Sequence, residues 1–279
     1  MRIILSLIVA ILLAAAIALP WLITPTESES DASADTSQLT QVPEVEIKTE
    51  VPDFNEIRDV RAKKEAFFSF LMPAVKAENI RILLQREELS AIHASFQENA
   101  QLTSSQAERL QRLADMYDVD FEDNSLDDVF TLLLRRIDVV PESLVLVQAA
   151  NESGWGTSRF ATEGLNFFGQ WCFRKGCGLV PSDRDEDGNH EVAKFASVNA
   201  SVRSYLRNIN THPAYLELRQ IRASYHQNGD QAAATDLTPG LLSYSERREE
   251  YIEELNAMIR VNRPLIREVS AVTLAEPLE

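Results

Sequence analysis

Histidine and the common catalytic motifs are scarce in this chain of 279 residues. Its four histidines form no H-x-x-x-H or H-E-x-x-H pair, so no helix would present two zinc ligands on one face. The chain also lacks a G-x-S-x-G nucleophile elbow, a Walker loop and a G-x-G-x-x-G turn after a strand. The sequence therefore gives no support to serine hydrolase, nucleotide or dinucleotide chemistry, and it predicts neither a metal nor a cofactor.

Positive charge is also in deficit. The chain has 27 Lys and Arg against 43 Asp and Glu, for a formal net charge of −16 at pH 7. No Lys/Arg cluster is longer than Arg135-Arg136 or Arg247-Arg248. Because such a chain repels phosphates, nucleic acid is not an expected partner.

Cysteine is limited to Cys172 and Cys177, with four residues between them. The N-terminus indicates export, because Arg2 is followed by an uncharged apolar run from residue 3 to 19. In an exported chain two nearby cysteines favour a disulfide. A metal or redox site is the alternative, with His190 as the only close further ligand.

The apolar N-terminal run continues to Ile23 and fits two kinds of export segment. Ala16-Ile17-Ala18 has the small-x-small spacing of a signal peptidase site. At about 21 residues the run is also long enough to span a bilayer at roughly 1.5 Å per residue. Trp21 would then suit the outer interface and Arg2 the inner side. We expect residues 1–23 to be a signal peptide or a signal anchor.

Three further parts follow the export segment. Residues 24–51 carry seven acids against Lys48 and no aromatic residue, which predicts a disordered acidic linker. Residues 52–124 show the apolar spacing of helices, and the first of these is expected to end near Pro73. Residues 125–279 form the last part.

The last part begins with a candidate buried helix. After Ser125, which opens a helical pattern of its own, Pro141 starts a short and almost wholly apolar segment that leads to Glu152 and stops at Gly154. A helix that is apolar all round is buried all round. The sequence thus places Glu152 at the end of a buried element.

A small β-lobe is expected between residues 170 and 196. The runs Gly178-Leu179-Val180 and Glu191-Val192-Ala193 flank the turn signal Asp187-Gly188, which is typical of a hairpin. Helical patterns resume after the lobe, from Ser197 and from Ser245. The predicted fold class is α+β, mainly α.

Glu152 is the side chain with the clearest chemical potential. A carboxyl group at the end of an apolar helix is desolvated, which raises its pKa toward the value that a general acid needs near neutral pH. Cleavage of a glycosidic bond requires such an acid. The alternative is that Glu152 caps backbone groups or pairs with Arg159.

Several stretches around Glu152 resemble a known family. They are similar to the glucosaminidase domain of glycoside hydrolase family 73, and most closely to the Bax-type branch of bacterial envelope proteins. The resemblance covers roughly residues 135–262 and is carried by Gln148-Ala149-Ala150-Asn151-Glu152-Ser153-Gly154-Trp155-Gly156, Asn166-Phe167-Phe168-Gly169-Gln170-Trp171-Cys172-Phe173 and Asn208-Ile209-Asn210-Thr211-His212-Pro213-Ala214-Tyr215.

The resemblance implies an activity and a place in the cell. It implies a lysozyme-like helical domain with a β-lobe, which cleaves peptidoglycan glycan strands next to N-acetylglucosamine. It also implies a periplasmic location, either anchored to the inner membrane or released after signal cleavage. The regulatory partner is not identified by the sequence.

Site residues follow from the same resemblance. Glu152 matches the general acid of the family, and Tyr205 matches a tyrosine that acts with it. The second carboxylate has no clear match: Glu191 is the first choice and Asp183 the second, and the 2-acetamido group of the substrate could act instead, with Tyr205 stabilising the developing charge. The residues expected to bind substrate are Trp171, Trp155, Asn166, Phe168 and Gln148, of which Trp155 is expected to do more for packing.

Two other functions are compatible with these residues. A lytic transglycosylase would share the fold and the acid but would leave an anhydro sugar. A non-catalytic peptidoglycan-binding or scaffold module would need no second carboxylate.

Overall fold

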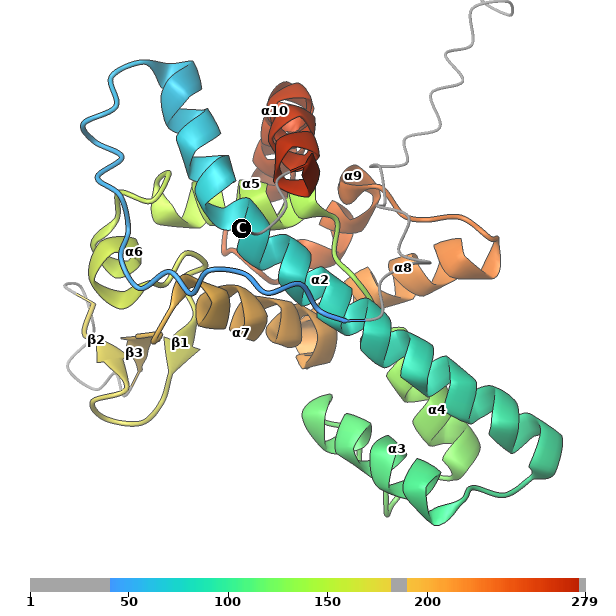
Figure 1. Cartoon of the computed structure of the whole chain (residues 1–279). Coiled ribbons are helices and arrows are strands. Elements are labelled where there is room, and N and C mark those ends of the chain that lie inside the picture. The colour runs from blue at the N-terminus through green and yellow to red at the C-terminus, as the bar shows by residue number, and fades with distance from the viewer. Residues whose placement is uncertain (1–40, 182–189, 276–279) are drawn as a thin grey trace, which may run out of the picture. The chain divides into compact units, whose positions relative to one another are not determined.

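A computed structural model describes residues 41–181 and 190–275 of the chain (Figure 1). The expected fold class, α+β and mainly α, is confirmed, since most of the described elements are helices and the three strands between α6 and α7 form one small sheet. The longer helices are α2 (Val60–Asn99), α3 (Ser104–Met116), α4 (Leu126–Arg136), α5 (Glu142–Ser153), α7 (Val198–Thr211), α8 (Leu216–Gln227) and α10 (Glu249–Ala275). The shorter ones are α6 (Arg159–Gly164), α9 (Ala234–Leu237) and the 3₁₀ turns η2 (Pro213–Tyr215) and η3 (Thr238–Leu241).

Helix α2 is the central helix of the described residues, since five other helices pack on it. It contacts α5, α7 and α10 along its first half and α3 and α4 along its second (Figure 1). The expectation that this helix ends near Pro73 is wrong, because the helix continues through Pro73. Leu71, Met72, Ala74 and Val75 around the proline are all buried, and this packing on several helices offsets the cost of a proline inside a helix.

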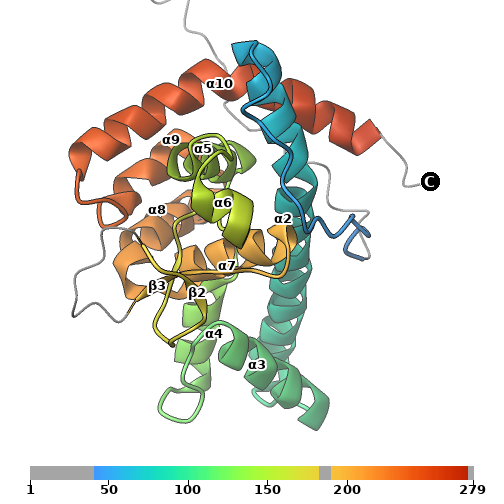
Figure 2. The same cartoon turned by 90° about the vertical axis from the view of Figure 1, so that its left-hand side faces the viewer.

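The predicted parts 52–124 and 125–279 share one hydrophobic core. Phe67 and Leu71 of α2 belong to the same buried cluster as Val145 of α5 and Leu255 of α10. Figure 2 shows α5 between α2 on one side and α8 and α9 on the other, with α10 across one end. Enclosure by helices from both parts explains why α5 can be apolar on every side.

The end of the predicted acidic linker lies against the fold, which corrects its expected boundary at residue 51. The Lys48 backbone O accepts a hydrogen bond from the Val198 N–H at 2.9 Å, and Lys48 Nζ donates to the Phe70 O at 2.9 Å. The Lys48 ammonium also lies 4.7 Å from the centre of the Phe70 ring. These contacts order a segment whose composition alone predicts disorder.

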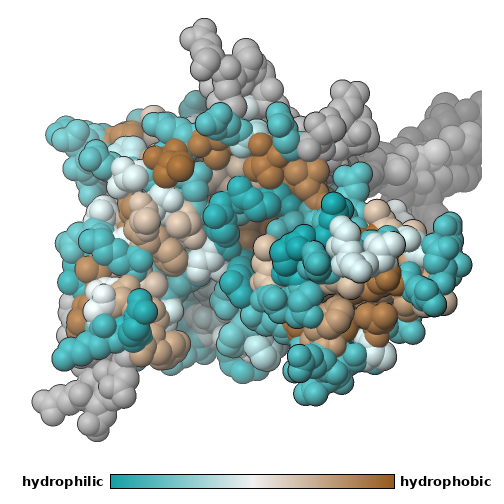
Figure 3. Space-filling model, turned by 60° about the horizontal axis from the view of Figure 1, so that its bottom comes forward, coloured by the Kyte–Doolittle hydropathy of each residue, from teal (hydrophilic) through white to brown (hydrophobic). Residues whose placement is uncertain are grey.

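The predicted export segment, residues 1–23, lies outside the described residues. Within residues 41–181 and 190–275, no helix is both long enough and apolar enough to cross a membrane. The face of the molecule in Figure 3 carries hydrophilic side chains interspersed with separate hydrophobic patches.

The β-lobe is a small antiparallel sheet in the order β1-β3-β2. The predicted pairing is confirmed between β2 (Gly178–Leu179) and β3 (Glu191–Ala193), with Leu179 opposite Val192. A third strand, β1 (Trp171–Cys172), pairs with the other edge of β3. The lobe therefore places Cys172 on one side of β3 and Cys177 on the other.

A buried ion cluster joins the segment between α4 and α5 to α8 and α2. Asp138 Oδ2 lies 3.3 Å from Arg222 Nε, 2.6 Å from His226 Nε2 and 3.8 Å from Arg86 NH1. Burial raises the pKa of Asp138, but Arg222, His226 and Arg86 together hold this pKa below its usual value. Asp138 thus contributes stability that is present above its unfolded pKa and is lost as the pH falls through its folded pKa.

We expect Asp138→Asn to lower the free energy of unfolding by about 3–5 kcal/mol, because the Arg222 guanidinium would remain buried without its counter-charge. Denaturant unfolding at pH 7 measures this loss. The matched control is Glu268→Gln, which breaks the exposed Arg61–Glu268 pair and should cost less than about 1 kcal/mol. Asp138→Asn should also lose less stability on acidification than the wild type, because it has no carboxyl group at this position to protonate. An equal loss of unfolding free energy in Asp138→Asn and Glu268→Gln would contradict the stabilising role of the buried Asp138 cluster.

Candidate active site

The turn after α5 holds Glu152 in place. Gly154, Trp155 and Gly156 all have left-handed backbones, with φ of 57°, 60° and 77°. Ser153 Oγ donates to the Ala149 O at 2.6 Å and accepts the Gly156 N–H at 2.8 Å, so it closes the turn. A left-handed tryptophan is strained, and such strain persists only where packing holds it.

That packing comes from the N-terminal part of the chain. The Trp155 ring lies edge-on to Phe67 and Phe68, with centroids 5.6 and 5.5 Å away. Phe54 lies beneath Gly156, where an added Cβ would be 2.6 Å from the Phe54 ring. The structure thus gives Trp155 a packing role, as the sequence favoured over substrate contact.

The Glu152 carboxyl group is half-buried and has one strong donor. Tyr251 Oη donates to Glu152 Oε1 at 2.9 Å. Burial raises the pKa of Glu152, and this outweighs the lowering by the Tyr251 hydrogen bond and by Arg247. Arg159, the alternative partner from the sequence, instead donates to the Val180 O at 2.7 Å. Glu152 is therefore a carboxyl group biased toward its protonated form.

A hydrogen-bond chain behind Glu152 fixes the direction of the Tyr251 proton. The Gln148 side chain accepts from Tyr205 Oη and donates through Nε2 to Tyr251 Oη at 3.0 Å. Since the Tyr251 oxygen accepts from Gln148, its own proton points to Glu152. Tyr205 is almost fully buried, and among the described residues its hydroxyl is linked to Glu152 by hydrogen bonds through Gln148 and Tyr251.

The turn from Asn166 to Gln170 lies beside the Glu152 carboxyl group. Asn166 Nδ2 donates to the Gln170 and Ala193 carbonyls at 2.9 Å each, and Asn166 Oδ1 accepts the N–H of Gln170 at 3.1 Å. This holds Gly169, with φ of 63°, so close to Glu152 that an added Cβ would be 3.9 Å from Oε2. The β-lobe therefore begins beside the acid.

The expectation that Gln148, Asn166 and Phe168 contact substrate is corrected by their burial. Each has an exposed fraction of 2% or less. Gln148 and Asn166 use their amides inside the protein, and the Phe168 ring stacks on Tyr205 with centroids 4.0 Å apart. These residues position the site instead. Trp171, in contrast, is 59% exposed and stays a predicted glycan contact.

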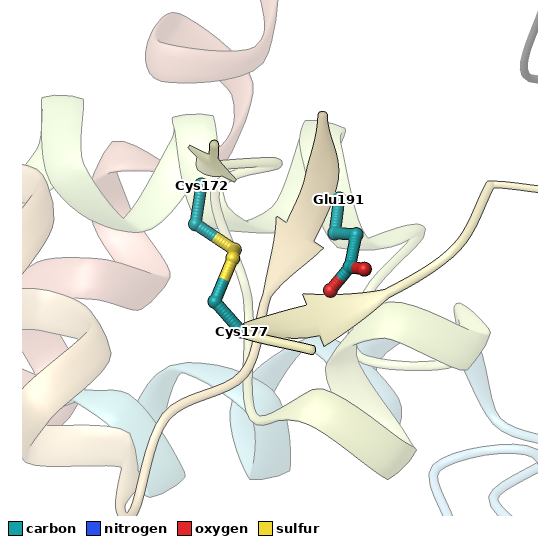
Figure 4. Close-up of side chains that lie close together, drawn as sticks. All are labelled: Cys172, Cys177 and Glu191. Carbon is teal, nitrogen blue, oxygen red and sulfur yellow. A yellow bond between two sulfur atoms is a disulfide. The ribbon is translucent and has the colours of Figure 1, made fainter. Parts of the chain in front are cut away.

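The predicted disulfide between Cys172 and Cys177 is confirmed. Glu191 lies beside the disulfide (Figure 4). One of its carboxylate oxygens and the two sulfur atoms all lie within 4.8 Å of one another. The Glu191 carboxylate accepts the N–H groups of Gly176 and Gly178 at 2.9 and 2.8 Å. With both sulfurs bonded and the carboxylate engaged, the arrangement does not favour a metal.

The same contacts give Glu191 a structural task in the lobe, which does not favour its predicted role as a base. The second choice, Asp183, lies outside the described residues. Tyr251 is not among the residues that the sequence predicted for the site, and it lies in the first turn of α10, 99 positions from Glu152. Its only local signal is a buried tyrosine in an amphipathic helix, which is equally typical of a core residue.

Comparisons with known proteins agree with the resemblance in the sequence. Residues 128–263 match a family model described as glucosaminidase, mannosyl-glycoprotein endo-beta-N-acetylglucosaminidase. The chain is 33% identical to protein bax of Escherichia coli (strain K12) over 216 residues, which are 77% of this chain and 76% of that protein. No solved structure matches the chain. The matched region contains Glu152, the lobe and Tyr251, whereas α2 and α3 lie outside it.

We expect Tyr251→Phe to raise the pKa of Glu152 further. In the wild type the Tyr251 hydrogen bond stabilises the charged carboxylate and so lowers this pKa, and the variant loses that bond. Titration of the Glu152 carboxyl carbon by NMR measures this. Tyr244→Phe is the control, since the Tyr244 hydroxyl donates to the Phe168 O at 2.8 Å and not to Glu152. An unchanged Glu152 pKa in Tyr251→Phe would contradict the geometry.

We expect Gly156→Ala to destabilise the protein more than Gly154→Ala. Both changes place a side chain on a left-handed backbone, at about 1–2 kcal/mol, but only at Gly156 does the new Cβ meet the Phe54 ring. Overpacking should add roughly 1–3 kcal/mol, as measured by chemical denaturation. In a Phe54→Ala background most of this additional loss should disappear, which leaves the milder contact with Phe67, 3.3 Å from the added Cβ. Persistence of the full loss would exclude Phe54 as the cause.

Proposed function

The chain belongs to the glucosaminidase family as a Bax-type protein, and from this premise we propose that it is a peptidoglycan hydrolase. It acts as an endo-β-N-acetylglucosaminidase on the glycan strand, with Glu152 as the general acid. The observation that carries this proposal is the Glu152 carboxyl group, whose pKa is raised by burial while Tyr251 fixes one of its oxygens.

The two oxygens of Glu152 have different tasks in this proposal. Oε1 accepts the Tyr251 hydrogen bond at 2.9 Å, so the acidic proton resides on Oε2, the oxygen beside Gly169. Oε2 donates this proton to the glycosidic oxygen as the bond to the anomeric carbon breaks. Activity should fall as the pH rises through the Glu152 pKa, since the acid must be protonated in the free enzyme.

The second catalytic group is supplied by the substrate. The carbonyl oxygen of the 2-acetamido group attacks the anomeric carbon as the leaving sugar departs with the proton from Glu152. Water then attacks the same carbon, and Glu152 recovers its proton from that water. Glu254, the carboxylate that acts on the pKa of Glu152, is bound to Arg247 at 2.6 Å and is not a free base.

The proposed place of action is the bacterial envelope. Residues 1–23 have the composition of an export segment, which would deliver the chain to the periplasm. There it acts either anchored to the inner membrane or after release by signal cleavage.

We expect Glu152→Gln to reduce the release of soluble muropeptides from purified peptidoglycan by roughly 10²–10⁴-fold, the usual contribution of a general acid. Binding to the insoluble wall and the helical circular dichroism should persist. Glu163→Gln, which changes an exposed glutamate of α6, is the matched control and should retain full activity. Full activity in Glu152→Gln would exclude it as the acid. A wild-type chain that binds but never cleaves would indicate a non-catalytic module.

A further inference from the structure

The tip of the β-lobe presents aromatic and basic side chains together. Within the loop that Cys172 and Cys177 close, Phe173 is 75% exposed, and Arg174 and Lys175 are exposed as well. Trp171, just before the loop, is 59% exposed. Large exposed aromatic side chains beside cations are unusual on a chain with a net charge of −16 and indicate a contact surface.

The loop is held rigid from within. Its two ends are joined by the disulfide and flank β3 (Figure 4). The buried Glu191 carboxylate binds the N–H groups of Gly176 and Gly178, and the Cys177 N–H closes a turn onto the Arg174 O at 3.0 Å. None of these bonds uses the side chains that the loop presents. A preorganised loop loses little conformational entropy when it binds a ligand.

The loop also begins near the reacting centre. Gly169 adjoins Glu152 Oε2, and the chain enters the lobe at Trp171, two residues later. A glycan strand held at Glu152 and Trp171 would thus bring its substituents toward Phe173, Arg174 and Lys175. Sugar hydroxyl and acetamido groups are uncharged, whereas the short peptides on peptidoglycan carry free carboxylates, which are the complementary partners of Arg and Lys.

We propose that the Cys172–Cys177 loop binds the carboxylates of the peptides attached to the glycan strand, through Arg174 and Lys175. Phe173 packs against the peptide beside them. The inference rests on the proposed function for its substrate, and it makes the protein selective for peptide-bearing glycan.

The test measures binding to insoluble peptidoglycan, so that it does not depend on cleavage. The full chain carrying Glu152→Gln is compared with the same chain carrying Arg174→Ala and Lys175→Ala in addition. Each is bound to native peptidoglycan and to peptidoglycan whose carboxylates have been converted to neutral amides with carbodiimide and ammonia. Arg112→Ala with Arg267→Ala is the control, since it removes the same charge from exposed positions on α3 and α10.

We expect the loop variant to bind native peptidoglycan roughly 3- to 10-fold more weakly, as for two solvent-exposed charge pairs. Its deficit should vanish on the amidated wall, and the control pair should bind like the parent. Equal weakening by the control pair, or a deficit that persists on the amidated wall, would overturn the inference. Muropeptide release by the wild type, assayed separately, tells failure of the loop inference apart from failure of the proposed hydrolase.

Discussion

The hydrogen bond from Tyr251 to Glu152 is the constraint around which the site is organised. It joins the end of α5 to the start of α10 at 2.9 Å, and its direction is set by Gln148, whose side-chain N–H donates a hydrogen bond to the Tyr251 oxygen. A carboxyl group desolvated between these helices is pushed toward its neutral form, while a single donor keeps one oxygen fixed. Without this donor the carboxyl group would stay half-buried but would lose the hydrogen bond that fixes Oε1.

The rest of the fold keeps this pair enclosed. The turn after α5 is strained at Trp155, and the aromatic rings of Phe54, Phe67 and Phe68 hold it from the N-terminal side. These rings lie outside the region that matches the glucosaminidase family. Helix α2 is therefore part of the structure that positions Glu152 rather than a separate module, and the segment around Lys48 packs against this helix.

Local chemistry was predictable from the sequence, and long-range partners were not. The apolar run before Glu152, the stop at Gly154, the Cys172–Cys177 pair and the two runs that form β2 and β3 each carry their signal within a few residues. Tyr251 and the backbone partners of Glu191 depend on which segments meet in space, which periodicity does not reveal. Burial likewise turned Asn166 and Phe168 from predicted substrate contacts into internal supports, because the motif that identifies them does not say which way they face. The lysozyme-like architecture implied by the resemblance stays a prediction.

The central claim, that the chain hydrolyses the glycan strand after N-acetylglucosamine, is tested most directly by the new chain ends that the protein creates. Purified peptidoglycan is digested by the wild-type chain in ¹⁸O-labelled water, and the released muropeptides are analysed by mass spectrometry. We expect reducing N-acetylglucosamine ends that contain one ¹⁸O atom. Anhydro ends without the label, which a lytic transglycosylase would leave, or labelled ends on N-acetylmuramic acid, would contradict it.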